Sequence, residues 1–224
     1  MIFVLTYNYP HKKTQDLLFK LQLQDYDKIT VVSTPWVERK NFKPIFPHRI
    51  GQVNDIYPKE LCKKLSFDYI ELDSLDDFPE IYDNDYILIG GAGIIKKELA
   101  DSKKIINSHP AYLPLVRGLD SMKWAIYNNK PLGVTSHIIS EEADQGWLIR
   151  RKFVPLYEWD TFHSVAMRQY DIEIDLLASA VRDIKDATLE SLAVEGIPVH
   201  RRMPHKIERE MISQFPDYVR KNLK

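Results

Sequence analysis

Short runs of apolar residues recur along the chain, and many of their side chains are β-branched. The first run, Ile2–Thr6, is apolar almost throughout, which is typical of a strand buried on both faces of a sheet. Similar runs predict further strands at Ile29–Ser33, Tyr69–Leu72, Tyr86–Ile89, Gly133–Ser140 and Trp147–Val154.

Segments with a helical spacing of apolar residues alternate with these strands. They predict helices at Thr14–Leu23, Pro58–Leu65, Ser121–Asn128, Thr161–Lys185 and Lys206–Phe215. We expect Thr14 to cap the first helix, because threonine is favoured at N-caps. The alternation predicts an α/β fold with a doubly wound, mostly parallel sheet in residues 1–160. A short helical C-terminal extension, residues 161–224, follows and is expected to form a dimer contact.

Chemically capable side chains follow the predicted strands. Lys104–Ile106 leads into a segment that carries Asn107 and His109, and Pro110, Pro114 and Gly118 predict that this segment is a rigid loop. An asparagine amide can donate hydrogen bonds to a developing oxyanion, and a histidine can carry a proton between pH 5 and 8.

Asp144 lies further along the chain, within Ala-Asp-Gln-Gly. A carboxylate beside a histidine orients the imidazole or favours its charged form. Amide, imidazole and carboxylate together indicate acyl transfer to an amine. In a doubly wound sheet, ligands bind beyond the carboxyl ends of the strands, where this segment is expected to lie.

Composition narrows the classes of function. The chain has 224 residues and a formal net charge of −1, which gives no support to a broad nucleic-acid surface. Cys62 is the only cysteine, so an internal disulfide and a multi-cysteine zinc site are excluded. No apolar run approaches the roughly 20 residues of a membrane span, and the short apolar N-terminus lacks the basic start of a signal peptide. We therefore expect a cytoplasmic protein without a membrane or nucleic-acid partner.

A set of spaced motifs extends over residues 85–155. It comprises Asn107-x-His109-Pro110, Leu113-Pro114, Arg117-Gly118, Gly133-Val134-Thr135-x-His137 and Asp144-x-Gly146. This set resembles the 10-formyltetrahydrofolate-dependent formyltransferases. The resemblance implies a Rossmann-like catalytic core, with Asn107, His109 and Asp144 as the catalytic residues.

The resemblance also implies a folate pocket, with 10-formyltetrahydrofolate as cosubstrate and no metal. One wall would be the turn after Ile89, and the other would be the segment before Asp144. The residues expected to bind this cosubstrate are Gly91, Gly93, Ile94, Ile95, Ile139 and Ala143.

The family contains several acceptor classes. The segment after the first strand, Tyr7–Lys13, lacks the glycine-rich phosphate loop of the glycinamide ribonucleotide enzymes. The C-terminal part is too short for the extra domain of the methionyl-tRNA enzymes. The remaining subgroup formylates dTDP- or UDP-linked amino sugars for surface polysaccharide and O-antigen (lipopolysaccharide) synthesis. Resemblance to this subgroup also implies a homodimer.

Alternatives stay open at this point. They are phosphoribosylglycinamide or another amine as acceptor, hydrolysis of formyltetrahydrofolate, and a binding protein on an inactive scaffold. We expect three segments to bind the substrate: the end of the first strand, the proline-rich loop 34–58, and the Arg117-Gly118 pair. The loop 34–58 is expected to order when the substrate binds. The residues expected to bind the substrate are Tyr7, Asn8, Tyr9, His48, Arg49, Arg117 and Gly118.

Several of these residues also have plainer explanations. The pair His48-Arg49 is also explained as a solvated loop charge, and Arg117 as a brace for its own loop. His137 is either a functional residue or a hydrogen-bonded core histidine. The cluster His200-Arg201-Arg202 is a solvated patch, a substrate contact or a dimer contact.

Overall fold

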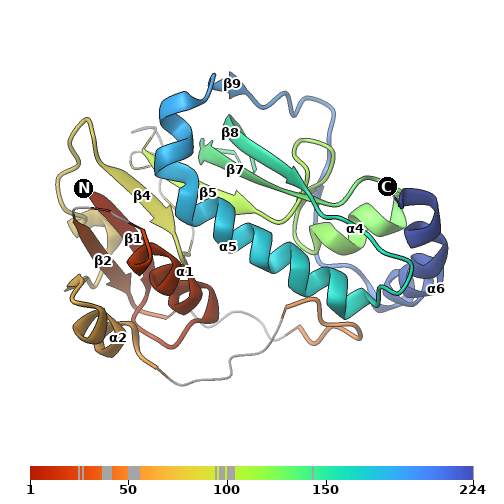
Figure 1. The fold of residues 1–224 in the computed structure, drawn as a ribbon, viewed down its shortest axis with the longest axis horizontal. Helices are drawn as coiled ribbons and strands as arrows, with labels where there is room; N and C mark the ends of the chain where they lie inside the picture. Colours follow the sequence, from red (N-terminus) through yellow and green to blue (C-terminus); the bar gives the residue numbers. More distant parts are fainter. Residues whose placement is uncertain are drawn as a thin grey trace.

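One mixed sheet organises the protein. The structure is a computed structural model, and it describes residues 1–24, 26, 28–36, 42–49, 56–93, 95, 99, 104–142 and 144–223. The sheet order is β3-β2-β1-β4-β5-β7-β8-β9 (Figure 1). Its strands are β1 (Ile2–Tyr7), β2 (Ile29–Thr34), β3 (Asp68–Glu71), β4 (Tyr86–Ile89), β5 (Ile105–His109), β7 (Gly133–Ile139), β8 (Gly146–Phe153) and β9 (Glu190–Ser191).

The first half of this sheet is parallel and the second half is antiparallel. Strands β3, β2, β1, β4 and β5 pair in parallel, whereas β7, β8 and β9 continue the sheet in antiparallel fashion. A separate pair is formed by β6 (Arg117–Gly118) and β10 (Val199–His200). The expected mostly parallel α/β sheet is thereby confirmed.

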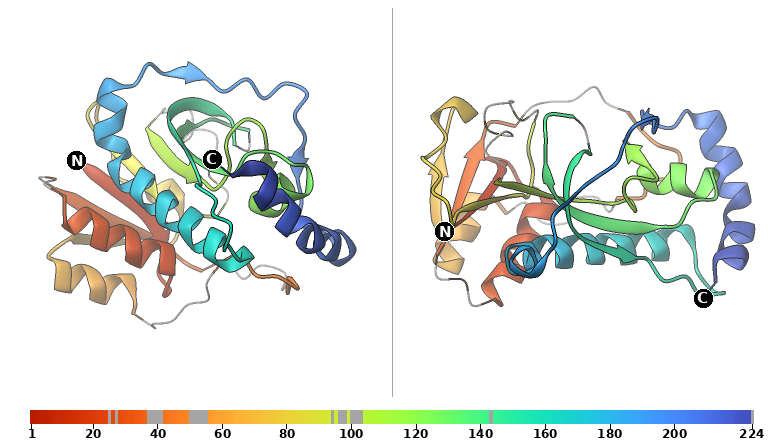
Figure 2. Two further views of the ribbon diagram at one scale, coloured as in Figure 1. Left: turned by 45° about the vertical axis from the view of Figure 1, so that its right-hand side comes forward. Right: turned by 90° about the horizontal axis from the view of Figure 1, so that it is seen from above.

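One face of the large sheet is covered by α1 (Lys12–Gln22) and α5 (Phe162–Asp186). The part of the chain that the structure describes also includes α2 (Pro58–Leu65), α4 (Ser121–Tyr127), α6 (His205–Asn222) and the 3-10 turn η1 (Leu75–Asp77). Helices α1 and α5 lie on the same side of the sheet (Figure 2). Leu17, Leu177 and the strand residues Val4 and Ile106 pack there in one buried cluster.

On the opposite face pack described residues from the segment that contains η1 and from the turn after β4. Phe3, Leu5 and Ile105 point to this side and form a second buried cluster. Strand residues alternate between the two faces, so Asn107 and His109 share the face of Ile105. A third cluster joins α4, α6 and the start of α5, with Met122, Met211 and Phe215 at its centre.

Two helix predictions need correction at their ends. Helix α1 begins at Lys12 and has no side-chain cap, because the Thr14 hydroxyl faces β1 and shares a 2.5 Å hydrogen bond with Thr6. Helix α6 continues past Phe215 through Pro216 to Asn222. Tyr218 and Val219 are buried beyond the proline, and their packing outweighs the hydrogen bond that proline removes.

A further expectation also differs from the structure. Asn107 and His109 lie on β5 rather than in a loop, because their backbone pairs with β7 and prolongs the strand. Helix α5 packs along β7, β5 and α1 and so covers the sheet. Its Leu177 and Ala178 are fully buried, which explains this placement.

Candidate active site

The end of β5 carries the first part of the site. Asn107 and His109 are two residues apart on one strand, and their partners on β7 are His137 and Thr135. Directly opposed residues of antiparallel strands share a face. The sheet therefore gathers an amide, two imidazoles and a hydroxyl on the side opposite α5.

Asp144 joins this group from the segment before β8. Its Oδ1 lies 3.1 Å from His109 Nδ1, and its Oδ2 accepts a 2.6 Å hydrogen bond from the backbone N–H of Gly118. Gly118 has φ +91°, and an added Cβ would lie 2.2 Å from the backbone oxygen of His200. Only glycine fits this approach, so Gly118 holds the carboxylate from the side of β6.

The protonation state of His109 follows from its surroundings. His109 is 8% exposed, and burial lowers its pKa below the usual 6.5, although Asp144 and Glu173 oppose the shift. Burial thus outweighs the expected effect of Asp144, and the imidazole is neutral at pH 7. Since the carboxylate accepts from Nδ1–H, the lone pair lies on Nε2, which has no hydrogen-bond partner among the described residues.

Thr135 and His137 hold the two segments that flank the site. The Thr135 hydroxyl donates to the Ala111 carbonyl at 2.8 Å and accepts the N–H of Leu113 at 3.0 Å. His137 Nδ1 lies 3.2 Å from the carbonyl of Gln145, next to Asp144. Burial, followed by the influence of His109, lowers the pKa of His137 to about 4. His137 is therefore a neutral donor that fixes the Asp144 segment.

Some of the residues expected to bind the folate lie on the same face of the sheet as His109. Ile95 and Ile139 pack against the same cluster as Leu5 and Ile105, on the face of His109. Gly93 faces open space, with no atom within 4 Å of an added Cβ. Ile94 and Ala143 lie outside the described residues. Ile95 and Ile139 therefore lie on the same face of the sheet as His109.

Gly91 has a different role from Gly93. An added Cβ at Gly91 would lie 2.9 Å from His11 Nδ1 and 3.0 Å from the Tyr7 ring. Its backbone N–H donates to the carbonyl of Leu5 at 3.0 Å. Gly91 thus permits close packing of the turn after β4 against the segment after β1.

A cavity of about 520 Å³ opens beyond the carboxyl end of β1. It combines cationic and aromatic side chains with one buried acid, and its lining is Tyr9, Pro10, His11, Lys12, Lys13, Trp36, Arg49, Tyr170, Glu173 and Arg202. Tyr9 and Trp36 are about half exposed, with ring centroids 5.6 Å apart. Lys13 Nζ lies 3.5 Å from the carbonyl of Ser108, so the cavity adjoins β5 between Asn107 and His109.

Glu173 of α5 organises the cations of this cavity. Its carboxylate is 1% exposed and lies 2.9 Å from Lys13 Nζ and 2.7 Å from Arg49 Nη1. Burial alone would raise the pKa of Glu173, but Arg49 and Lys13 outweigh it and lower the pKa to about 2. The carboxylate stays charged and ties α1 to the segment 42–49.

The predicted substrate residues divide into two groups. Tyr9 and Arg49 line the cavity. Tyr7 is buried, and the Asn8 amide donates to Glu71 at 3.0 Å and accepts the N–H of Trp36. The Arg117 guanidinium is buried and donates to the Ile197 carbonyl at 3.1 Å, as expected of a brace.

His48 is half-buried beside its neighbour Arg49. Burial, then the nearby charge of Arg49, lowers the pKa of His48 to about 4, so it is not a cation at neutral pH. Within the basic cluster, Arg202 lines the cavity and pairs with Asp120 at 2.8 Å. His200 is partly exposed and stacks on Trp124 with ring centroids 4.5 Å apart.

Sequence reasoning missed Lys13, Gln169 and Glu173. Gln169 of α5 donates to the carbonyls of Pro110 and Gly133 at 3.0 Å and so supports the segment after His109. A polar residue at a buried position of an apolar helix face is the signal that could have found Gln169 and Glu173.

Comparison with known proteins defines the class. Residues 77–181 match the family model described as formyl transferase, and these residues include β5, β7, β8 and most of α5. Residues 77–181 are therefore similar to a formyl transferase domain, which confirms the resemblance drawn from the motifs.

Individual relatives extend the comparison. A dTDP-4-amino-4,6-dideoxyglucose formyltransferase of Mycobacterium bovis is 33% identical over 100 residues, which is 44% of this chain and 43% of that protein. A phosphoribosylglycinamide formyltransferase of Bacillus subtilis is 32% identical over 82 residues, 36% of this chain and 42% of that protein. The matched stretch thus spans less than half of the length of these relatives.

A solved structure matches over most of the chain. The N-formyltransferase of Helicobacter canadensis, in complex with folinic acid and dTDP-3-aminofucose, has a TM-score of 0.63 and 18% identity. The match covers 96% of this chain and 80% of that one, and it shows that the fold is shared.

None of the helices among the described residues is both long and apolar enough to span a membrane. Within the same residues, no three His, Cys, Asp or Glu side chains are grouped so as to hold a metal ion.

Proposed function

We propose that the protein is an N-formyltransferase that moves a formyl group from 10-formyltetrahydrofolate to the amine of a dTDP- or UDP-linked amino sugar. One observation carries the proposal: the Asn107, His109 and Asp144 group at the end of β5 adjoins a cavity lined by cations and aromatic rings. The residues proposed for formyl transfer thereby lie next to a cavity that suits a charged, ring-bearing acceptor.

In the proposed reaction one proton passes from the acceptor amine to N10 of the folate by way of His109. Bound 10-formyltetrahydrofolate supplies the formyl group on its N10 nitrogen. The amine nitrogen forms a bond to the formyl carbon, and the bond from that carbon to N10 breaks. His109, neutral before the reaction, takes a proton from the attacking amine on Nε2 and returns it to N10. Asn107 donates a hydrogen bond to the developing oxyanion.

Asp144 serves His109 in this scheme. Its carboxylate fixes the tautomer with the proton on Nδ1 and stabilises the imidazolium that forms when Nε2 accepts a proton. Gly118 and His137 hold the carboxylate and its segment in place.

The acceptor proposal rests on the chemistry of the cavity. Lys12, Lys13, Arg49 and Arg202 suit a diphosphate, since arginine binds phosphate oxygens in a bidentate manner. The rings of Tyr9 and Trp36 can stack on a nucleobase. The dTDP-sugar acceptors named for the mycobacterial and Helicobacter relatives support the same choice.

The wider setting is also proposed. A formamido sugar would serve surface polysaccharide or lipopolysaccharide O-antigen synthesis in the cytoplasm, as the family resemblance implies.

We propose a homodimer, because Tyr157, Trp159 and Met167 expose large apolar areas around the start of α5. Light scattering of the purified protein tests this, and a monomer at micromolar concentration contradicts it.

An acceptor panel tests the reaction. The protein is incubated with 10-formyltetrahydrofolate and dTDP-, UDP- or GDP-linked amino sugars, with phosphoribosylglycinamide and a reaction without acceptor alongside. Mass spectrometry of the acceptors is expected to show formylation of a dTDP- or UDP-linked amino sugar. Formylation of phosphoribosylglycinamide alone, or release of formate without an acceptor, would replace this proposal with the corresponding alternative.

A further inference from the structure

The C-terminal helix α6 reaches the loop that supplies Arg49. Glu208 of α6 is 0% exposed, and its two carboxylate oxygens accept the backbone N–H groups of Ile45 at 2.9 Å and Phe46 at 3.0 Å. The same carboxylate forms an ion pair with Lys123 of α4, which is also fully buried. Glu208 therefore joins two helices to the segment 42–49.

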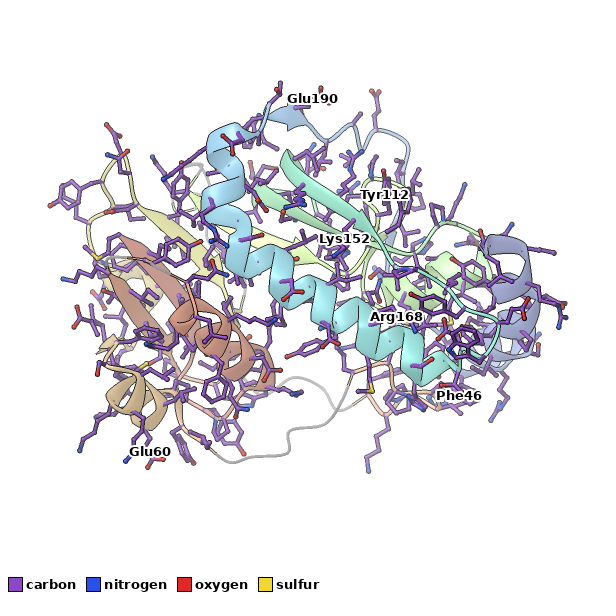
Figure 3. The ribbon with its side chains drawn as sticks, in the orientation of Figure 1. Phe46, Glu60, Tyr112, Lys152, Arg168 and Glu190 are labelled. Carbon is purple, nitrogen blue, oxygen red and sulfur yellow. The ribbon has the colours of Figure 1, made fainter. Side chains whose placement is uncertain are left out.

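Further contacts secure the same segment on α6. His205 Nε2 lies 2.9 Å from the carbonyl of Lys43, and the His205 ring lies 5.5 Å from the ring of Phe42. The Phe46 side chain packs against the cluster formed by α4, α5 and α6. In Figure 3, Phe46 lies at the same end of the molecule as α6. Both the backbone and the side chains of residues 42–46 thus make contacts that hold this segment on α6.

The other end of the segment enters the cavity. Arg49 follows Phe46 by three residues, so their Cα atoms are at most about 11 Å apart. Arg49 reaches Glu173 at 2.7 Å and lines the cavity with Lys13. Fixing Ile45 and Phe46 therefore limits where the guanidinium of Arg49 can lie.

A buried ion pair is an uncertain source of stability. Removing two charges from water is costly, and an apolar pair of similar volume is often as stable. The Lys123–Glu208 pair is better explained by the two backbone N–H groups that its carboxylate orders. An apolar side chain at position 208 could not accept them.

We propose that Glu208 is a positioning residue for the acceptor: by fixing residues 45–46 it places Arg49 in the basic cavity. This assigns the C-terminal helix a role in acceptor binding, and it rests on the proposed function. Glu208 touches neither substrate, so its effect is expected on acceptor binding rather than on the chemical step.

A double-mutant cycle tests the proposal. Glu208→Gln is expected to raise the KM for the nucleotide-linked acceptor about tenfold, the size of weakening one charged contact, and to leave the KM for 10-formyltetrahydrofolate and kcat unchanged. In an Arg49→Ala background the same substitution should have no further effect on acceptor KM, because its effect passes through Arg49. Additive effects of the two substitutions, or an unchanged acceptor KM in Glu208→Gln, would overturn the proposal.

A matched control separates positioning from general destabilisation. Asp160, whose side chain is 1% exposed, pairs with the partly exposed Arg168 at 2.8 Å, at the start of α5 and outside the segment 42–49. Asp160→Asn should lower stability and leave the acceptor KM unchanged. If Glu208→Gln does not fold, the double variant Lys123→Met, Glu208→Gln leaves no buried charge unpaired and is expected to show the same acceptor KM defect.

Hydrogen exchange tests the anchor without any substrate. The amides of Ile45 and Phe46 should exchange faster in Glu208→Gln than in wild type, whereas Asp160→Asn should match wild type in this segment. Unchanged exchange at residues 45–46 overturns the anchor itself. Faster exchange in a protein that formylates no nucleotide-linked sugar would retain the anchor and reject the proposed function.

Discussion

His109 combines three properties that a proton carrier needs. It is buried, its Nδ1 is paired with Asp144 at 3.1 Å, and its Nε2 is unpartnered within the described chain. Burial lowers its pKa, and the negative charges of Asp144 and Glu173 limit that decrease. The imidazole is therefore a neutral base at pH 7 whose strength is set by its neighbours.

Neutralising Asp144 should change the pH profile in a defined direction. Asp144 raises the pKa of His109, so Asp144→Asn lowers that pKa further. The acidic limb of kcat/KM, which follows deprotonation of His109 in the free enzyme, should move to lower pH. The maximum rate should fall because the imidazolium loses its counter-charge. A profile measured from pH 4.5 to 8 that keeps its limb, or moves it upward, contradicts this account.

Single residues of the site were unequally predictable. Asn107, His109 and Asp144 stand in a spaced motif, so the sequence alone indicates them. Glu173 belongs to no sequence motif. Its ion pairs with Lys13 and Arg49 form only because α5 packs beside those residues. Long-range ion pairs of this kind follow from the tertiary fold, and local pattern does not reveal them.

The strand pair β7 and β8 shapes the segment that carries Asp144. The register of the pair shifts between Ser136 and His137, and Gly146 begins β8 with φ +122°. An added Cβ at Gly146 would lie 1.9 Å from the carbonyl oxygen of Ile138. The start of β8 therefore depends on a glycine two residues after Asp144.

Alanine at Gly146 should disturb both stability and activity. The backbone strain alone is worth about 1–3 kcal/mol, and each kcal/mol lowers the Tm of a chain of this size by roughly 2–4 °C. The close contact with Ile138 adds to this cost and shifts Asp144, so turnover should fall too. Thermal unfolding and the formylation assay measure the two effects.

Gly196 provides the matched control. It has φ +73°, but no atom lies within 4 Å of an added Cβ. Gly196→Ala should therefore cost only the conformational term and leave turnover unchanged. Equal losses of Tm and turnover in the two variants would show that the Ile138 contact does not matter.

Most elements were predictable, and the errors have local causes. Helix α2 and strand β4 have the predicted ends, because proline, glycine and apolar periodicity mark them clearly. The last residues of β5 are polar and so were predicted to be a loop, but pairing with β7 keeps them in the sheet. The two-residue strands β6, β9 and β10 have no sequence pattern of their own.

Buried ionisable groups link the stability of the whole molecule to pH. Burial lowers the pKa of His48 and of His137 to about 4, compared with 6.5 for the free side chain. Glu173 has a pKa of about 2, compared with 4.5, because Arg49 and Lys13 outweigh its burial. In each case the unfolded chain binds protons at a higher pH than the folded protein does.

Acidification should therefore destabilise the protein in two stages. Stability is lost from about pH 6.5 towards pH 4 as the unfolded state protonates its histidines, and again below about pH 4.5 through Glu173. Denaturant unfolding at a series of pH values measures this loss. His48→Gln should flatten the loss between pH 6.5 and 4, whereas the exposed His163→Gln should follow wild type. Identical slopes in all three proteins would contradict the assignment for His48.

The overall architecture was predictable as a class but not in detail. Strand and helix alternation indicated the doubly wound sheet, whereas the antiparallel half from β7 to β9 and the docking of α6 on the segment 42–49 were not predicted. Those features depend on which distant surfaces fit together. The basic cavity illustrates the point, because Lys13, Arg49, Glu173 and Arg202 come from four separate parts of the chain.

The role of the group at the end of β5 is tested most sharply by comparing two histidines in the formylation reaction. Turnover of 10-formyltetrahydrofolate with the preferred nucleotide-linked amino sugar is measured for wild type, His109→Ala and the exposed His163→Ala. We expect wild-type turnover for His163→Ala and a loss of about 100- to 1,000-fold for folded His109→Ala, the range seen when one catalytic donor or proton carrier is removed. Turnover near the wild-type rate in folded His109→Ala would contradict the central claim that the group at the end of β5 performs formyl transfer.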